Sequence, residues 1–165
     1  MSGDGWRADF EAIVSELDHP MFIVTTAGGG RRAGCLVGFA TQTSIDPSGL
    51  LVGLSRRNHT FRVACEARAL AVHCPGADQV ALAELFGGRT GDEIDKFAHC
   101  RWSEGPEGLP ILDACPSWIV GTISDRLDVG DHVGFLLEPV AARHGRSGPQ
   151  LGYQAVRHLE PGHPP

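Results

Sequence analysis

The sequence has no apolar run long enough to cross a membrane and no excess of positive charge. A membrane-spanning helix needs roughly 18 consecutive apolar residues, which no part of the chain supplies. The formal net charge of −6 argues against nucleic-acid binding, because surfaces that bind nucleic acids are usually basic. The first residues are acidic and lack the layout of a signal peptide. We therefore expect a cytoplasmic protein without a membrane or nucleic-acid partner.

Closely spaced cysteine pairs are also missing. The five cysteines are scattered, odd in number and without a C-x-x-C, so reduced thiols are expected. The adjacent pairs His73-Cys74 and His99-Cys100 would point to opposite faces of a strand, which keeps either pair from gripping one ion. Structural zinc sites also need the absent cysteine spacing. We expect no metal and, because G-x-S-x-G and H-E-x-x-H do not occur, no nucleophile–base pair.

Short apolar or alternating runs separated by turn residues make up most of the chain. A length of 165 residues favours one domain, here residues 1–165, and such a chain can bury about 70% of its unfolded surface. The expected strands cover about residues 21–26, 33–40, 50–54, 69–74, 118–124, 132–143 and 151–159, and the expected helices 61–67 and 79–86. This pattern predicts a small antiparallel barrel with helices at its ends.

Apolar residues at helical spacing precede the first expected strand. They are Trp6, Phe10, Ile13, Val14 and Leu17, with Asp4 as a candidate N-cap. The spacing predicts a helix within residues 1–18 that packs on the barrel. At the other end, residues 160–165 are expected to form a flexible tail.

The stretch from residue 34 to residue 60 alternates apolar strands with polar segments. The polar run at 41–44 (Thr-Gln-Thr-Ser) is predicted to be a loop, and the strand at 50–54 ends in Ser-Arg-Arg-Asn-His-Thr. Neutral hydrogen-bonding groups at one strand end and cations at the other would suit a flat, polar-edged ring carrying a phosphate. The alternatives are an ordinary polar turn and capping of the following helix by Asn58 or Thr60.

This stretch resembles the signature of the flavin reductase-like family of FMN-binding split barrels. The family pattern is roughly G-M-T-x-S-S-F-T-S-V-S-L-D-P, and residues 34–47 align with it without a gap. Asn58-His59-Thr60 stands at the family's S-x-T, Asp95-Lys96-Phe97 matches its D-K-F, and Gly130-Asp131-His132 matches its G-D-H. The four motifs occur in the family's order over about residues 20–143.

The chain departs from the family pattern at three places. Gly38-Phe39 replaces Ser-Ser, Pro47-Ser48 replaces Pro-Pro, and a Tyr-x-Arg-Gly near the C-terminus is reduced to Tyr-Gln-Ala-Val at 153–156. These departures concern the choice of flavin and the way the second substrate is held more than the fold.

The resemblance implies a mostly β fold with helices (α+β), the FMN-binding split barrel of antiparallel Greek-key type with peripheral helices. It implies an NAD(P)H-dependent flavin reductase, in which NADH or NADPH gives a hydride to FMN or FAD. Such proteins are usually homodimers, and they often supply diffusible reduced flavin to a separate monooxygenase. The alternative is a flavin-binding protein without turnover, or a barrel that binds a deazaflavin or haem.

The resemblance also assigns roles to individual residues. His132 is expected beside the nicotinamide, where a neutral imidazole can donate a hydrogen bond to the carboxamide. Thr41, Gln42, Thr43 and Ser44 are the candidates for the flavin ring and ribityl chain, Arg57, Asn58 and Thr60 for the phosphate, Lys96 for a carboxylate or phosphate, and Phe97 for a ring. A structural histidine, a solvated lysine and a core phenylalanine are the respective alternatives.

Overall fold

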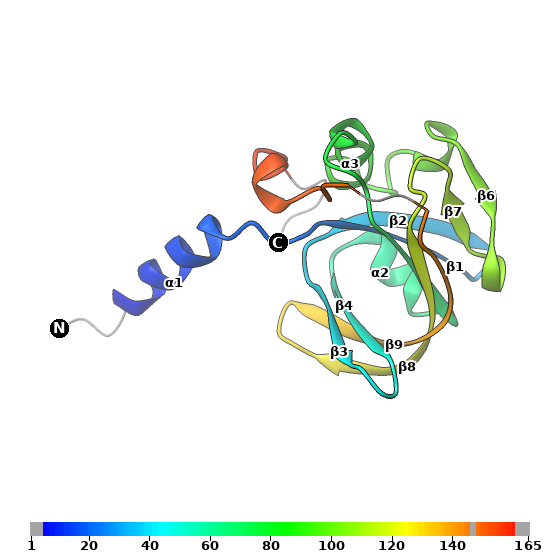
Figure 1. The fold of residues 1–165 in the computed structure, drawn as a ribbon, viewed down its shortest axis with the longest axis horizontal. Coiled ribbons are helices and arrows are strands. Elements are labelled where there is room, and N and C mark those ends of the chain that lie inside the picture. The colour runs from blue at the N-terminus through cyan, green and yellow to red at the C-terminus, as the bar shows by residue number, and fades with distance from the viewer. Residues whose placement is uncertain (1–4, 146–147, 161–165) are drawn as a thin grey trace.

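The chain is built around one seven-stranded antiparallel sheet. The computed structural model describes residues 5–145 and 148–160, so the expected Asp4 cap and most of the expected tail lie outside the described residues. The sheet has the strand order β2-β1-β5-β8-β9-β4-β3, and β6 pairs with β7 beside it (Figure 1). The helices and strands are α1 (Gly5–Glu16), β1 (Phe22–Gly28), β2 (Arg31–Val37), β3 (Ala40–Ser44), β4 (Gly49–Ser55), α2 (His59–Ala64), β5 (Ala69–His73), α3 (Val80–Gly87), η1 (Lys96–Ala98), β6 (Trp102–Glu104), η2 (Pro106–Gly108), β7 (Pro110–Leu112), β8 (Trp118–Asp128), β9 (His132–Arg143) and η3 (Tyr153–Ala155).

The curled sheet encloses the main apolar core. Val24, Leu54, Leu70 and Phe135 meet there and are almost fully buried. Every residue of β5 is buried, because Leu70 and Val72 face the main core while Ala69 and Ala71 pack in a second cluster on the other face of the strand. β2 and β3 lie at the two ends of the strand order, so the barrel is not closed. The predicted antiparallel, mostly β architecture with helices is confirmed.

The polar run at residues 41–44 is a strand, which corrects the loop expected there. β3 pairs antiparallel with β4, with Ala40 opposite Val52 and Thr41 opposite Leu51. Threonine has a high preference for strands, and the hydrogen bonds of the β3–β4 ladder satisfy this backbone without any loop. The preceding strand ends at Val37, so the chain changes direction at Gly38 and Phe39.

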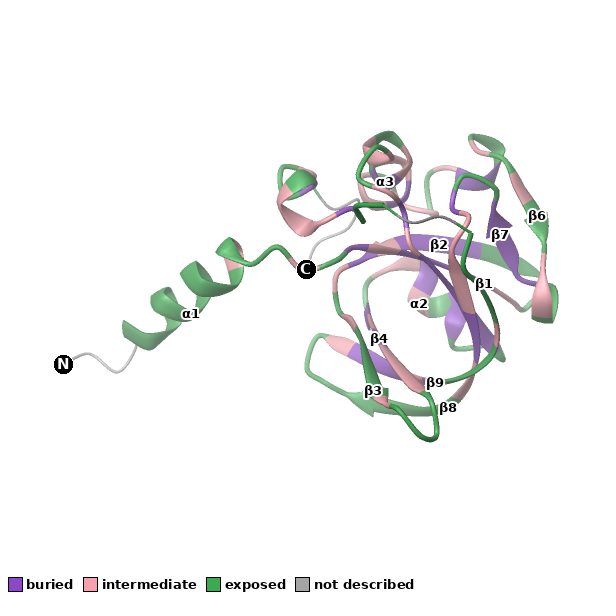
Figure 2. Cartoon of the chain, in the orientation of Figure 1, coloured by how far each residue is buried: buried purple, intermediate pink, exposed green. Residues whose placement is uncertain are grey.

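Helix α1 forms where the spacing predicts it, but it does not pack on the barrel. None of its residues is buried, and Trp6 and Phe10 are 63% and 57% exposed. Figure 2 shows α1 projecting from the body with an almost entirely exposed surface. Near its C-terminal end, the Gln154 amide donates to the carbonyl oxygens of Ser15 (2.9 Å) and Leu17 (2.8 Å). The expected packing on the barrel is therefore wrong within one chain, because the apolar residues of α1 contact too little of the body to become buried.

Two boundaries near the C-terminus also differ from expectation. β8 continues to Asp128 through residues expected to be a turn, because β9 provides a ladder as far as the pair Asp128–Val133. Residues 151–159 do not form the expected strand. They contain the 3₁₀ turn η3, and Leu151 is fully buried in a satellite cluster with Met21 and Ala83.

His73 joins β1, β5 and β7 through a fully buried imidazole. Its Nδ1 lies 2.9 Å from the Ile23 carbonyl oxygen, and its Nε2 accepts the Leu112 N–H at 3.0 Å. A carbonyl can only accept and an N–H can only donate, so the ring is neutral with its proton on Nδ1. Burial lowers the pKa of His73 to about 4.

This buried histidine predicts acid sensitivity below neutral pH. The unfolded chain takes up the proton near pH 6.5 and the folded chain only near pH 4, so the unfolded state binds more protons between these values. The free energy of unfolding should therefore fall by about 3 kcal/mol as pH drops through this window. Urea denaturation at several pH values measures the slope. His73→Asn should lose that slope, and an equal slope in both proteins would contradict the assignment.

Candidate functional site

An apolar groove lies over strands β3, β4 and β9 where the turn between β8 and β9 meets them. Its volume is about 470 Å³. The groove is lined by Gly38, Phe39, Ala40, Thr41, Leu51, Gly53, Val129, Asp131, His132 and Gly134. Seen in Figure 1, the β8–β9 turn and helix α1 lie on the same side of the molecule.

Two glycines keep the floor of the groove open. Gly53 and Gly134 face each other across β4 and β9. A Cβ at Gly53 would come within 3.1 Å of the Phe39 Cβ, and one at Gly134 within 3.1 Å of Leu51. The Gly53 N–H also donates to the Phe39 carbonyl oxygen at 2.7 Å. The missing side chain at Gly53 thus lets the bend at Phe39 lie close against the sheet.

His132 and Phe39 form the aromatic side of the groove. Their ring centroids are 4.9 Å apart with the planes tilted by 57°. The His132 Nδ1 lies 2.6 Å from the Asp131 carboxylate, and the hydrogen bond with His132 lowers the pKa of Asp131. An ionised carboxylate accepts only, so the Nδ1 carries the proton and the Nε2 of a neutral ring is left as the second hydrogen-bonding atom.

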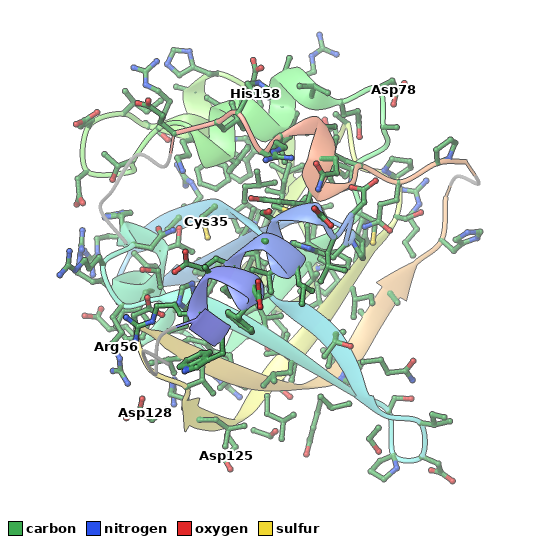
Figure 3. The ribbon with its side chains drawn as sticks, turned by 90° about the vertical axis from the view of Figure 1, so that its left-hand side faces the viewer. Cys35, Arg56, Asp78, Asp125, Asp128 and His158 are labelled. Carbon is green, nitrogen blue, oxygen red and sulfur yellow. The ribbon has the colours of Figure 1, made fainter. Side chains whose placement is uncertain are left out.

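The turn that carries His132 is bonded to the beginning of the segment at residues 55–60. Ser55 lies opposite His132 in the β4–β9 ladder. The Arg56 N–H donates to the Asp131 carbonyl oxygen at 3.0 Å, and its Nε donates to the Gly130 carbonyl oxygen at 3.1 Å. Arg56 also forms an ion pair of 2.8 Å with Asp128, which lies near it at the same edge (Figure 3). The structure therefore brings two of the predicted motifs together.

The candidates for the phosphate lie within this segment at residues 55–60. The Asn58 carboxamide oxygen accepts the Thr60 N–H at 2.9 Å and caps helix α2. Thr60 is almost fully buried, whereas the Arg57 side chain is exposed. The capping alternative raised by the sequence is thus present. The guanidinium of Arg57 remains on the surface, where its charge adds to the effect of His132 in lowering the pKa of Asp131.

The run Thr41–Ser44 reaches the groove only at its first residue. Thr41 lines the groove, but Ser44 lies opposite Gly49 at the far end of the β3–β4 hairpin. Gly49 and Ser55 are the two ends of β4, which at the rise of a strand separates them by about 20 Å. Gln42 and Thr43 lie between and are exposed. Within one chain, these residues lead away from the segment at 55–60.

Lys96 and Phe97 belong to the protein core. The Lys96 ammonium donates to the carbonyl oxygens of Gly34 (2.9 Å) and Phe86 (2.8 Å), and burial lowers its pKa. The Phe97 ring packs edge-on against Phe86 and Trp102. Both side chains already have partners within the chain, which favours the structural alternative for each of them.

Phe39 is a groove residue to which the sequence interpretation gave no role. It is 62% exposed although it is large and apolar. The available signal was the bulky aromatic at a place where the family pattern has a small polar residue. Over the described ranges, no group of three or more His, Cys, Asp or Glu side chains is arranged to hold a metal ion, and no helix is long and apolar enough to cross a membrane.

The open antiparallel sheet and its groove define the class of flavin reductase split barrels. A flavin reductase domain protein from Arthrobacter sp. FB24 superposes with a TM-score of 0.80 at 24% identity, covering 89% of this chain and 90% of that one. A homologue of nitrilotriacetate monooxygenase component B from Mycobacterium thermoresistibile superposes with a TM-score of 0.76 at 22% identity, covering 87% and 79%. These likenesses confirm the predicted fold.

The chain belongs to the flavin reductase like domain family, whose pattern matches residues 14–161. An FMN reductase (NADH) RutF from Pseudomonas syringae pv. syringae is 30% identical over 149 residues, which cover 90% of this chain and 83% of the relative. The family resemblance found in the four motifs is thereby confirmed.

Proposed function

We propose that this protein is an NAD(P)H-dependent flavin reductase whose flavin ring lies in the groove beside His132. The observation that carries the proposal is the junction of the His132 turn with residues 55–60, since it joins a groove lined by an imidazole and an aromatic ring to a segment that bears two arginines. The FMN reductase (NADH) activity in the relative's name supports the same reaction.

The shape and the chemistry of the groove support a flavin at this place. Its glycine floor is a cradle that a Cβ at Gly53 or Gly134 would partly fill. The Thr41 hydroxyl and the backbone at Gly38 offer hydrogen-bonding groups to the carbonyl and nitrogen edge of the ring. Arg57 and Asn58 would hold the phosphate, with a charge-assisted hydrogen bond from the guanidinium. FMN and FAD share all of these parts.

Within this site, the residues bind and orient rather than transfer protons. A bound flavin accepts the hydride that a reduced nicotinamide supplies. Asp131 holds the His132 ring by its Nδ1, and the Nε2 remains to hydrogen-bond the nicotinamide carboxamide. Phe39 and Val129 cover the groove with apolar surface, which excludes water from the reacting faces.

A homodimer is the assembly we propose. Helix α1 exposes an apolar stripe of Trp6, Phe10 and Ile13, which Leu17 extends just beyond the helix. An isolated helix of this length is marginal in water unless that face is covered. Phe39 and Val129 expose apolar surface at the groove as well. A two-fold arrangement covers both surfaces at once, because each copy provides a helix and a groove.

We also propose a cellular compartment and a protein partner. All five cysteines are unpaired, which supports a reducing compartment such as the cytoplasm. The likeness to nitrilotriacetate monooxygenase component B supports the proposal of a separate monooxygenase that takes reduced flavin by diffusion.

The decisive experiment follows NADH and NADPH oxidation in the presence of FMN or FAD. We expect turnover with at least one nicotinamide and flavin pair, and a flavin Kd measurable by fluorescence quenching. Flavin binding without any nicotinamide oxidation would favour the second candidate, a flavin-binding protein without turnover, which the changed Gly38-Phe39 pair motivates. A protein that binds neither flavin would overturn both.

A further inference from the structure

The imidazole of His19 occupies the space directly above Gly38. A Cβ built on Gly38 would lie 2.7 Å from the His19 Nε2 and 3.2 Å from the Met21 Sδ. Such a separation is shorter than any real contact of a Cβ, so only glycine at position 38 is compatible with this position of the ring. His19 and Gly38 are therefore a matched pair from two distant segments.

Contacts on the other side of the ring hold His19 in place. Its ring stacks on Tyr153 with centroids 4.9 Å apart and planes within 12°. The Tyr153 N–H donates to the His19 carbonyl oxygen at 2.9 Å, and the next residue, Pro20, forms a bridge with Gly152. The ring is thus fixed between η3 and the bend at Gly38.

The fixed ring has hydrogen-bonding capacity that the chain does not use. Among the described residues, no hydrogen bond or ion pair reaches the His19 nitrogens, although the residue is only partly exposed. Gly38 lines the groove beside Phe39, which contacts His132. His19 does not itself line the groove, but its Nε2 lies against Gly38, which does, and it has no partner of its own among the described residues.

We propose that His19 is a further flavin-contacting residue, whose Nε2 hydrogen-bonds the polar edge of the ring at the Gly38 end of the groove. A neutral imidazole can present either an N–H or a lone pair there, which suits a ring edge that alternates carbonyl and nitrogen atoms. Because residue 38 has no side chain, the imidazole of His19 occupies the space that a side chain on residue 38 would fill. The inference rests on the proposed flavin site.

A pair of substitutions at residue 19 tests the hydrogen bond. His19→Leu keeps the bulk of the ring but removes both nitrogens, and should raise the flavin Kd about tenfold, the usual effect of one lost hydrogen bond. His19→Gln restores a polar group at a similar reach and should recover most of the affinity. His158→Ala, an exposed histidine far from the groove, serves as the matched control and should bind flavin as the wild type does.

A substitution at Gly38 tests the pairing itself. Gly38→Ser should weaken flavin binding and lower Tm, because its Cβ collides with the fixed ring. Gly38→Ser combined with His19→Ala removes the collision and places a hydroxyl in the vacated space, so that flavin affinity should return toward the wild-type value. The double variant binding no better than Gly38→Ser alone would overturn the pairing.

Measurements on the unaltered protein keep the inference testable if a variant folds poorly. The NMR resonances of the His19 ring should shift when FMN saturates the protein, whereas those of His158 should not. Unshifted His19 resonances, or a His19→Leu protein with wild-type flavin Kd, would overturn the role of His19 while leaving flavin binding intact. Absence of flavin binding by the wild type would instead overturn the proposed function.

Discussion

Replacing His132 with alanine should lower kcat/KM for the nicotinamide about tenfold or more while the flavin Kd changes little. The loss of one hydrogen bond to the carboxamide accounts for about 1.5 kcal/mol of transition-state stabilisation. The flavin would keep its proposed contacts with Thr41, Arg57 and Asn58, so its affinity is expected to be retained. Stopped-flow measurement of flavin reduction by NADH separates this step from flavin binding.

Two further variants make this result specific. His132→Asn retains a hydrogen-bonding side chain and should recover part of the rate, whereas Asp131→Asn should give a smaller loss, because it only loosens the orientation of the ring. His158→Ala again serves as the histidine control. Unchanged reduction kinetics in His132→Ala would remove His132 from the site.

Replacing Phe10 and Ile13 together with glutamate should convert the protein from a dimer to a monomer. Each large apolar side chain contributes roughly 1.5–3 kcal/mol when it is buried, and two-fold symmetry doubles the loss. The dimer Kd should therefore rise at least 100-fold. Sedimentation velocity should report twice the 17.6 kDa chain mass for the wild type and a single chain for the variant.

The monomer's own stability provides the control for this experiment. Phe10 and Ile13 are 57% and 61% exposed within the chain, so the variant should keep the wild-type circular dichroism spectrum. Glu11 lies on the same helix, and Glu11→Gln should leave the assembly unchanged. A wild-type protein that sediments as a monomer at micromolar concentration, or a double variant that remains dimeric, would contradict the proposed role of α1.

Local sequence signals predicted most of the sheet. The runs around β4, β5 and β9 are apolar and bounded by turn residues, and each forms a strand within a residue or two of the expected limits. These signals work because the spacing of apolar residues and the conformational preferences of turn residues act over only a few positions. The same signals failed at Thr41–Ser44, where pairing with β4 decides between loop and strand, and at 151–159, where apolar residues are buried by a turn rather than by a ladder.

The candidate site was only partly accessible from the sequence. The motifs at 55–60 and 130–132 could each be recognised, but only the β4–β9 register shows that they adjoin. Lys96 and Phe97 match a motif as well as His132 does, yet the first two are buried against Phe86. A motif records residue type and spacing, while burial and partners depend on segments far away in the chain.

The amino-acid sequence by itself determined the family, the antiparallel β architecture and the type of chemistry, because these depend on local periodicity and on residue types at set spacings. Only the tertiary structure decided which polar groups share the groove, that α1 projects with its apolar face uncovered, and that His19 meets Gly38. Those outcomes depend on strand register and on contacts between residues far apart in the sequence. No local pattern specifies them, since the same short motif can be buried or exposed according to what packs against it.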